Sequence, residues 1–215
     1  AGNASVEKNA SIDAGGIAIF AAGDMRLEEN ASFAAGNAAV EAGGDVSFVG
    51  PVLVRAGSLS IAAGGDVLID VEHTQLLGFN VDVRELAIEA GGRVEISDRT
   101  MLEVGGGALT SPLSIKASEF VQRGQFFRPV GESFTGTALI DAPAITLEQG
   151  LFFPSVVLTN STDKPSTVQV GPGAVLSAID TIDVVAKNGG RFDSRGRILA
   201  PYVNLHLGGG FDAVY

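Results

Sequence analysis

Residues 9–71 consist of three consecutive segments of equal length: NASIDAGGIAIFAAGDMRLEE (9–29), NASFAAGNAAVEAGGDVSFVG (30–50) and PVLVRAGSLSIAAGGDVLIDV (51–71). When the segments are aligned, glycines and aspartates fall into shared columns: Gly15/Gly36/Gly57, Gly23/Gly44/Gly65 and Asp24/Asp45/Asp66. Apolar residues do the same, in the columns Ile12/Phe33/Val54, Ile17/Ala38/Leu59, Ile19/Val40/Ile61, Met25/Val46/Val67 and Leu27/Phe48/Ile69. A fixed 21-residue period of this kind is typical of a solenoid.

Within each repeat the apolar residues alternate, as in Ile17-Ala18-Ile19 and Leu59-Ser60-Ile61. A two-residue period indicates β-strands, because successive side chains point to opposite faces. The glycines between the strands suit short corners. We therefore predict an all-β chain whose repeat forms one coil of a parallel β-helix (β-solenoid), with Ala18, Ala39 and Ser60 facing outward. Asn9 and Asn30 are expected to stack at a corner. A leucine-rich repeat fits less well, because the leucine/asparagine ladder is missing.

The pattern continues after residue 71 with longer spacings. Leu86 and Ile88 follow Leu59 and Ile61 at an interval of 27 residues. Further matches to this strand predict about nine coils in total: Leu113-Ser114-Ile115, Ile145-Thr146-Leu147, Ile182-Asp183-Val184 and Val203-Asn204-Leu205. We interpret residues 1–215 as a single solenoid segment, with regular coils over 1–115 and 182–215 and coils with long insertions over 116–181. Residues 152–170 are predicted to form a hairpin that turns at NSTDKPS.

Half of the chain's 12 phenylalanines lie in the region of the expected insertions, and Arg123 and Arg128 flank two of them. Loops on a rigid scaffold tend to carry recognition residues. The same rings would alternatively pack on the solenoid wall. The candidate binding residues are Phe120, Arg123, Phe126, Phe127, Arg128, Phe152 and Phe153.

Composition limits the classes of partner. The 25 acidic and 14 basic residues give a net charge of −11, and no basic run occurs, which argues against binding to nucleic acid. The sequence also lacks an apolar run long enough to span a bilayer. There is no cysteine, and the chain has only two histidines, so we expect neither a zinc site nor a cofactor.

Two kinds of chemistry remain as alternatives. The aspartate column would either bind calcium or accept hydrogen bonds from backbone amides at the corner while facing water. A polysaccharide-acting β-helix enzyme would need acidic residues on neighbouring coils beside a basic residue, and Asp70, Glu72, His73 and Arg84 are the candidates near the first insertion. His206 is expected to face outward.

The phrases SLSIAAGGDVLID (58–70), ELAIEAGGRVEIS (85–97) and RILAPYVNLHLGGG (197–210) resemble the coils of filamentous haemagglutinin and other two-partner-secretion exoproteins. The resemblance covers nearly the whole chain. It implies a right-handed parallel β-helix, export through an outer-membrane pore and a secreted or cell-surface location in a Gram-negative-type bacterium. Members of this family act as adhesins, contact-dependent toxins or carriers.

We therefore expect a non-enzymatic extracellular β-solenoid that acts as an adhesin or stalk. Its expected partners are a host-cell or cell-surface receptor or a glycan, together with neighbouring solenoid segments of the same protein. The sequence begins in mid-coil and stops just after another coil signature, and neither end has an amphipathic helix or a polar cap. We therefore expect a segment of a longer protein or a subunit that stacks end to end. The polysaccharide-acting enzyme and a self-stacking fibre remain the alternatives. An acidic cleft on adjacent coils would favour the enzyme.

Overall fold

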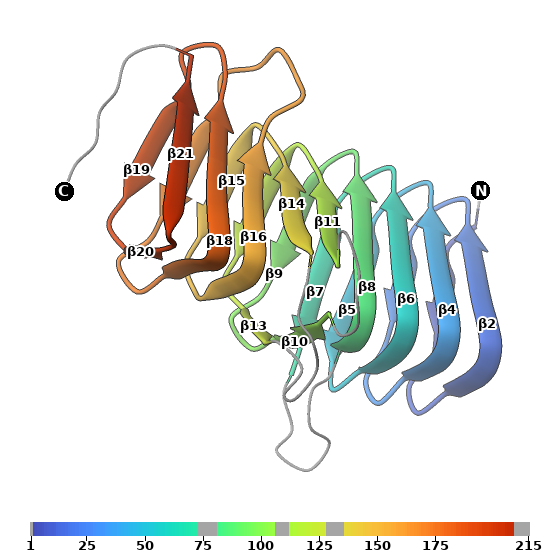
Figure 1. Ribbon diagram of the computed structural model, residues 1–215. Coiled ribbons are helices and arrows are strands. Elements are labelled where there is room, and N and C mark those ends of the chain that lie inside the picture. Colours follow the sequence, from blue (N-terminus) through green and yellow to red (C-terminus); the bar gives the residue numbers. More distant parts are fainter. Residues whose placement is uncertain (1, 73–80, 106–111, 128–135, 209–215) are drawn as a thin grey trace.

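The chain folds into a rod of stacked coils (Figure 1). The computed structural model describes residues 2–72, 81–105, 112–127 and 136–208. Across these ranges no residue is helical, and every strand pair is parallel. The architecture is an all-β parallel β-solenoid of about 8 turns with a period of about 22 residues, which confirms the predicted fold class. No helix long and apolar enough to cross a membrane occurs in the described part of the chain.

One side of the rod is a nine-stranded sheet to which each coil contributes one short strand. Its strands pair in chain order, and in the first coils the paired residues, such as Ala4 with Met25 and Met25 with Val46, follow the sequence repeat. The strands are β1 (Ala4–Val6), β3 (Met25–Leu27), β5 (Val46–Gly50), β7 (Val67–Val71), β9 (Arg93–Ile96), β12 (Glu119–Gln122), β15 (Ala144–Leu147), β17 (Thr167–Val170) and β19 (Arg191–Ser194).

The remaining sides belong to one twelve-stranded sheet, because its first strands are long and curve around the rod (Figure 1). The strands along its main path are β2 (Ser11–Ala21), β4 (Ser32–Ala42), β6 (Leu53–Ala63), β8 (Val81–Ala90), β11 (Leu113–Lys116), β14 (Thr137–Asp141), β16 (Leu151–Thr159), β18 (Val175–Ala186) and β20 (Arg197–Leu199). Beside this path lie β10 (Met101–Val104), β13 (Gln125–Phe127) and β21 (Tyr202–Leu207).

The inward faces of both sheets form one continuous apolar core. The alternation predicted from the sequence holds, because Leu59 and Ile61 are buried while Ser60 between them is exposed. Ala18, Ala39 and Ser60 follow one another in register on the outside. Burying each inward column removes large side chains from water, which is the main favourable term in folding.

The corner that leads from the twelve-stranded to the nine-stranded sheet explains the repeated Ala-Gly-Gly-Asp phrase. A Cβ at Gly64 would lie 2.3 Å from the carbonyl oxygen of Gly43 in the preceding coil, so only glycine fits there. The aspartate that follows links successive coils. Asp24 Oδ1 accepts a hydrogen bond from the Asp45 amide at 3.0 Å, and Asp45 Oδ1 accepts one from the Asp66 amide at 2.8 Å. Satisfying these amides from coil to coil stabilises the corner.

A second corner depends on asparagine. Asn9 and Asn30 adopt left-handed φ values of 64° and 59°, which asparagine tolerates better than most residues. Asn30 Nδ2 donates a hydrogen bond of 3.1 Å to Asn9 Oδ1. The predicted stacking of these two side chains is therefore confirmed.

The strand assignment after residue 115 differs from the sequence-based one. Ile145–Leu147 was predicted to continue the column of Leu113 and Ile115, and this is wrong: β15 lies in the nine-stranded sheet, where Ile145 pairs with Phe120. β14 takes the predicted place, since Ala138 and Ile140 pair with Leu113 and Ile115.

The hairpin predicted for 152–170 is also wrong. β16 and β17 lie in different sheets and pair with strands of other coils. The NSTDKPS segment connects them as a corner, in which Asn160 Nδ2 donates hydrogen bonds to the Lys164 carbonyl oxygen and to Ser166 Oγ.

Candidate functional site

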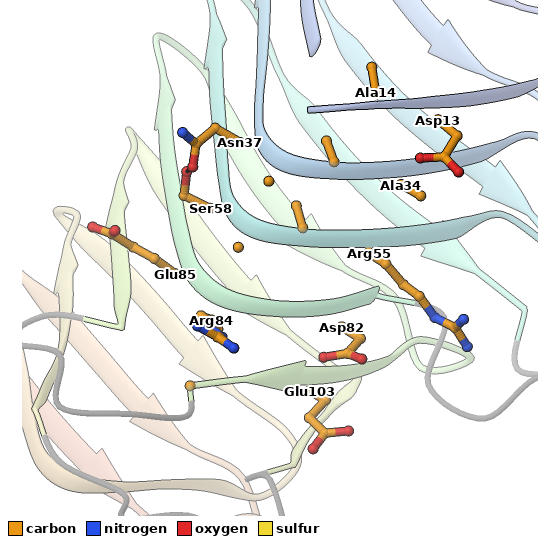
Figure 2. Close-up of a pocket in the computed structure, with 15 residues that line it drawn as sticks. Asp13, Ala14, Ala34, Asn37, Arg55, Ser58, Asp82, Arg84, Glu85 and Glu103 are labelled. Carbon is orange, nitrogen blue, oxygen red and sulfur yellow. Dashed lines mark hydrogen bonds between the residues drawn. The ribbon is translucent and has the colours of Figure 1, made fainter. Parts of the chain in front are cut away.

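A broad groove of about 1080 Å³ runs along the bend of β2, β4, β6 and β8 and reaches β10 (Figure 2). We call it the bend groove. Its floor is made of small residues, among them Ala35, Gly36, Ala56 and Gly57. Its charged residues are Asp13, Arg55, Asp82, Arg84, Glu85 and Glu103.

The floor is small because the chain turns sharply where the coils touch. A Cβ at Gly36 would lie 2.8 Å from the Gly15 carbonyl oxygen, and one at Gly57 would lie 2.5 Å from that of Gly36. Side chains are thereby excluded from the inner angle of the bend at Gly36 and Gly57, in the second and third repeats. Because no side chain fills this angle, the solvent-facing surface of the coils is hollowed along the bend. This hollow is the bend groove.

The charged residues reach the groove from register-matched positions of successive strands. Arg55 on β6 pairs with Asp82 on β8, and Asp82 pairs with Glu103 on β10. Strand spacing places such neighbours about 4.8 Å apart along the rod axis. Arg84 and Glu85 follow on β8, and Figure 2 shows Glu85 directed away from Asp82.

Five of these charged residues form no ion pair with one another. Among the ion pairs of the described residues, none involves Asp13, Arg55, Asp82, Arg84 or Glu85. All five are exposed. These five residues therefore present charges of both signs to the solvent without an ion pair to any described residue.

Elsewhere on the rod, charges in comparable positions do pair. Lys116 and Glu89 are register neighbours just as Arg55 and Asp82 are, yet Lys116 Nζ lies 2.7 Å from Glu89 Oε1. This hydrogen bond and the attraction between the two charges raise the pKa of Lys116. Lys8 and Glu29 also pair across coils, which raises the pKa of Lys8 and lowers that of Glu29.

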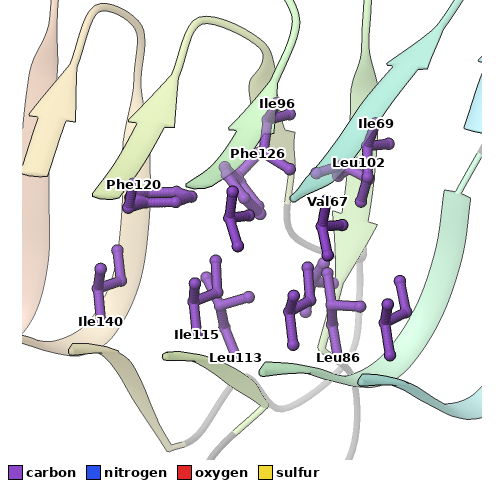
Figure 3. Close-up of a cluster of buried hydrophobic side chains, with 14 of the residues drawn as sticks. Val67, Ile69, Leu86, Ile96, Leu102, Leu113, Ile115, Phe120, Phe126 and Ile140 are labelled. Atoms are coloured by element: carbon purple, nitrogen blue, oxygen red, sulfur yellow. The ribbon is translucent and has the colours of Figure 1, made fainter. Parts of the chain in front are cut away.

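The predicted aromatic binding residues are largely part of the core. Phe120, Phe126 and Phe153 are buried, and Phe126 meets Phe153 edge to face with ring centroids 6.3 Å apart. Figure 3 shows Phe120 and Phe126 among the aliphatic side chains between the two sheets. Their rings pack inside the solenoid, whereas the alternative interpretation of the sequence had placed them on the outer wall beneath a loop. Phe152, outward on β16, is partly exposed.

The basic residues predicted for the same site do not join such a patch. Arg123 forms ion pairs with Glu95 at 2.5 Å and Glu148 at 3.3 Å on the nine-stranded sheet. Arg128 and the side chain of Phe127 lie outside the described residues.

The aspartates of the repeat column accept hydrogen bonds from backbone amides at the corner, which was one of the two interpretations of this column. Among the described residues, no group of three or more histidine, cysteine, aspartate or glutamate side chains is arranged to hold a metal ion.

Of the candidate catalytic residues, Asp70 and Glu72 both lie beside Arg99, but Arg84 lies apart from them. Asp70 accepts hydrogen bonds from Arg99 Nε at 3.2 Å and from Ser97 Oγ at 2.5 Å, and its bonding raises the pKa of Arg99. Glu72 lines a separate depression with Arg99, whereas Arg84 lies in the bend groove. His73 is outside the described residues, and His206 is exposed as predicted.

Reasoning from the sequence did not identify Asp13, Arg55, Asp82, Glu85 or Glu103 as candidates. The signal was present in the repeat alignment, in the column that follows the inward Ile12/Phe33/Val54 column and begins with Asp13, Ala34 and Arg55. That column faces outward beside the glycine column of the bend. The surface there is concave only because the strand bends, and the alignment does not show the bend.

No family model, no curated protein and no solved structure matches this chain.

Proposed function

We propose that this chain is a non-enzymatic segment of a secreted or surface-displayed β-solenoid of the filamentous haemagglutinin type, which projects from a Gram-negative-type cell and binds a receptor or glycan. Two features support the proposal. The rod is long and continuous, as a stalk requires, and its Ala-Gly-Gly phrases are those on which the resemblance to two-partner-secretion exoproteins rests.

The observation that carries the binding role is the unpaired state of Arg55 and Arg84 in the bend groove. An exposed ion pair contributes little to stability, so leaving these charges unpaired costs the fold little. An arginine that is not already bound to a carboxylate can donate in a planar fork to a carboxylate, sulfate or hydroxyl group of a partner. A groove that spans several coils suits an extended partner.

The test is a double variant, Arg55→Ala/Arg84→Ala, compared with the wild-type chain for binding to epithelial cells and to immobilised glycans. Arg26→Ala/Arg197→Ala is the matched control. Arg26 and Arg197 are likewise exposed, and they form no ion pair with a described residue, but neither lines the groove. We expect the groove variant to lose binding and the control to keep it. Equal binding by both variants, or no binding by the wild-type chain, would overturn the proposal.

A specific observation favours a polysaccharide-acting enzyme as the second candidate. Asp82 and Glu103 lie opposite each other on neighbouring strands and both line the groove beside Arg84. Glycosidases use two carboxyl groups about 5 to 9.5 Å apart, a range within reach of side chains on adjacent strands. This activity would be established if the wild-type chain released reducing ends from a polysaccharide and the variants Asp82→Asn and Glu103→Gln did not. If the wild-type chain binds glycans but releases no ends, the enzyme is ruled out and the binding role stands.

A further inference from the structure

The corner between β18 and β19 contains the chain's single Asn-Gly pair, Asn188-Gly189. Both residues are exposed and both have left-handed backbones, with φ values of 56° and 77°. Figure 1 shows this corner at the same end of the coil as the connection between β16 and β17.

Asn-Gly is the dipeptide in which the backbone nitrogen most easily reaches the preceding side-chain amide, because glycine places no side chain in the way. Here the surroundings add no obstacle: no heavy atom other than those of the adjoining residues lies within 4 Å of the position that a Cβ on Gly189 would occupy. Within the described residues, no carbonyl oxygen accepts a hydrogen bond from the Gly189 amide. The nucleophile is therefore open to solvent and unshielded.

We infer that Asn188 is a site of spontaneous deamidation. The Gly189 nitrogen loses its proton to solvent base and attacks Asn188 Cγ, forming a C–N bond and closing a five-membered succinimide ring as ammonia leaves. Water then opens the ring at either carbonyl carbon. The products are aspartate, or isoaspartate in which the main chain runs through the former side chain.

The modification changes the contact between two coils. Asn188 Nδ2 donates a hydrogen bond of 3.0 Å to the carbonyl oxygen of Asp163 in the corner of the preceding coil. An aspartate at this position is an acceptor only, so it faces that carbonyl oxygen without a donor. Two neighbouring hydrogen bonds then hold the corner without the side-chain bond. The Lys187 amide donates to Ser166 Oγ at 3.2 Å, and the Arg191 amide donates to the Ser166 carbonyl oxygen at 2.7 Å.

Isoaspartate has a larger effect than aspartate because it inserts an additional backbone atom. The insertion lies three residues before Arg191, where β19 begins and pairs with Thr167 of β17. We expect the pairing of β19 to loosen, while the coils that precede β17 keep theirs.

The test is incubation of the purified chain at neutral and mildly alkaline pH, followed by peptide mapping with mass spectrometry and by hydrogen exchange. The peptide that contains Asn188 should gain the mass of an amide-to-acid conversion, faster at the higher pH. Asn204 serves as the internal control, because it is exposed too but is followed by Leu205. Asn188→Gly, which accepts the left-handed backbone, should show no conversion in this peptide.

Aged wild-type protein should also exchange the β19 amides faster than fresh protein, and the Asn188→Gly variant should show no such difference on ageing. Conversion at Asn188 no faster than at Asn204 would overturn the inference. Conversion without any change in β19 exchange would overturn the structural consequence.

Discussion

Asp45 occupies the space that a side chain at Gly65 would need. A Cβ on Gly65 would lie 2.1 Å from Asp45 Oδ1, and the same oxygen accepts the hydrogen bond of the Asp66 amide at 2.8 Å. The glycine column and the aspartate column of the repeat are thus two halves of one contact between successive coils. The pairs Gly44 with Asp24 and Gly92 with Asp66 repeat it.

Gly65→Ala should therefore be clearly destabilising. The added methyl group would displace the Asp45 carboxylate from its amide partner, and overpacking of this kind costs about 1–3 kcal/mol. Gly150→Ala is the control, since nothing lies within 4 Å of a Cβ there and the backbone is not left-handed. Chemical denaturation of both variants measures the difference. Equal free energies of unfolding would show that the corner relaxes at no cost.

Asp45→Asn should retain nearly all of the stability, whereas Asp45→Ala should lose about 1 kcal/mol, the usual net contribution of one hydrogen bond. An asparagine oxygen can accept the amide hydrogen bond as well, and Asn3 Oδ1 does so for the Asp24 amide at 3.0 Å. Thermal or chemical unfolding compares the two variants. A loss in Asp45→Asn as large as in Asp45→Ala would mean that the negative charge, rather than the acceptor, is what matters.

Ile61→Asp should be far more damaging than Ser60→Asp. Ile61 is 1% exposed in the core, and an unpaired buried charge costs several kcal/mol. Ser60 faces solvent on the same strand, so its replacement should change the free energy of unfolding by less than about 0.5 kcal/mol. Similar denaturation midpoints for the two variants would contradict the inward orientation of Ile61 and the outward orientation of Ser60 on β6.

The ion pair between Lys116 and Glu89 predicts a pH effect of definite sign. Because Glu89 raises the pKa of Lys116, the contribution of this pair to stability is complete below the lysine's usual pKa of 10.5 and is lost as pH rises through the higher folded value. Titration of the Lys116 ammonium group by NMR should show the raised pKa in the wild-type chain. In Glu89→Gln it should fall back toward the usual value. An unchanged pKa in that variant would mean that the pair is not formed in solution.

The sequence predicted the first coils well because the 21-residue period places each strand unambiguously. Beyond residue 115 the coil length varies, and the alternation of Ile145-Thr146-Leu147 is the same as that of Leu113-Ser114-Ile115. A two-residue period tells which side chains face inward but not which sheet a strand joins. Only the pairing with Phe120 assigns Ile145 to the nine-stranded sheet.

The candidate site was harder to predict than the fold. The phenylalanine-rich segment suggested either a binding patch or rings packed on the outer wall of the solenoid, but Phe120 and Phe153 lie in the core. The bend groove depends on curvature within single strands, and Arg55, Asp82 and Glu103 come together only through the register of β6, β8 and β10. Neither property follows from composition or spacing.

All coils, including the irregular ones after residue 115, stack into a single continuous rod. The absence of cysteine allows spin labels to be placed at single engineered cysteines. Ala18 and Asp183 face outward in one column, separated by seven strand steps, which at about 4.8 Å each gives about 34 Å.

Ser60 and Asp183 are five steps apart in the same column, or about 24 Å. Double electron–electron resonance on the pairs Ala18→Cys/Asp183→Cys and Ser60→Cys/Asp183→Cys measures both distances. A continuous rod should give two narrow distributions whose means differ by about two strand spacings. Broad distributions, or equal means for the two pairs, would contradict a continuous solenoid.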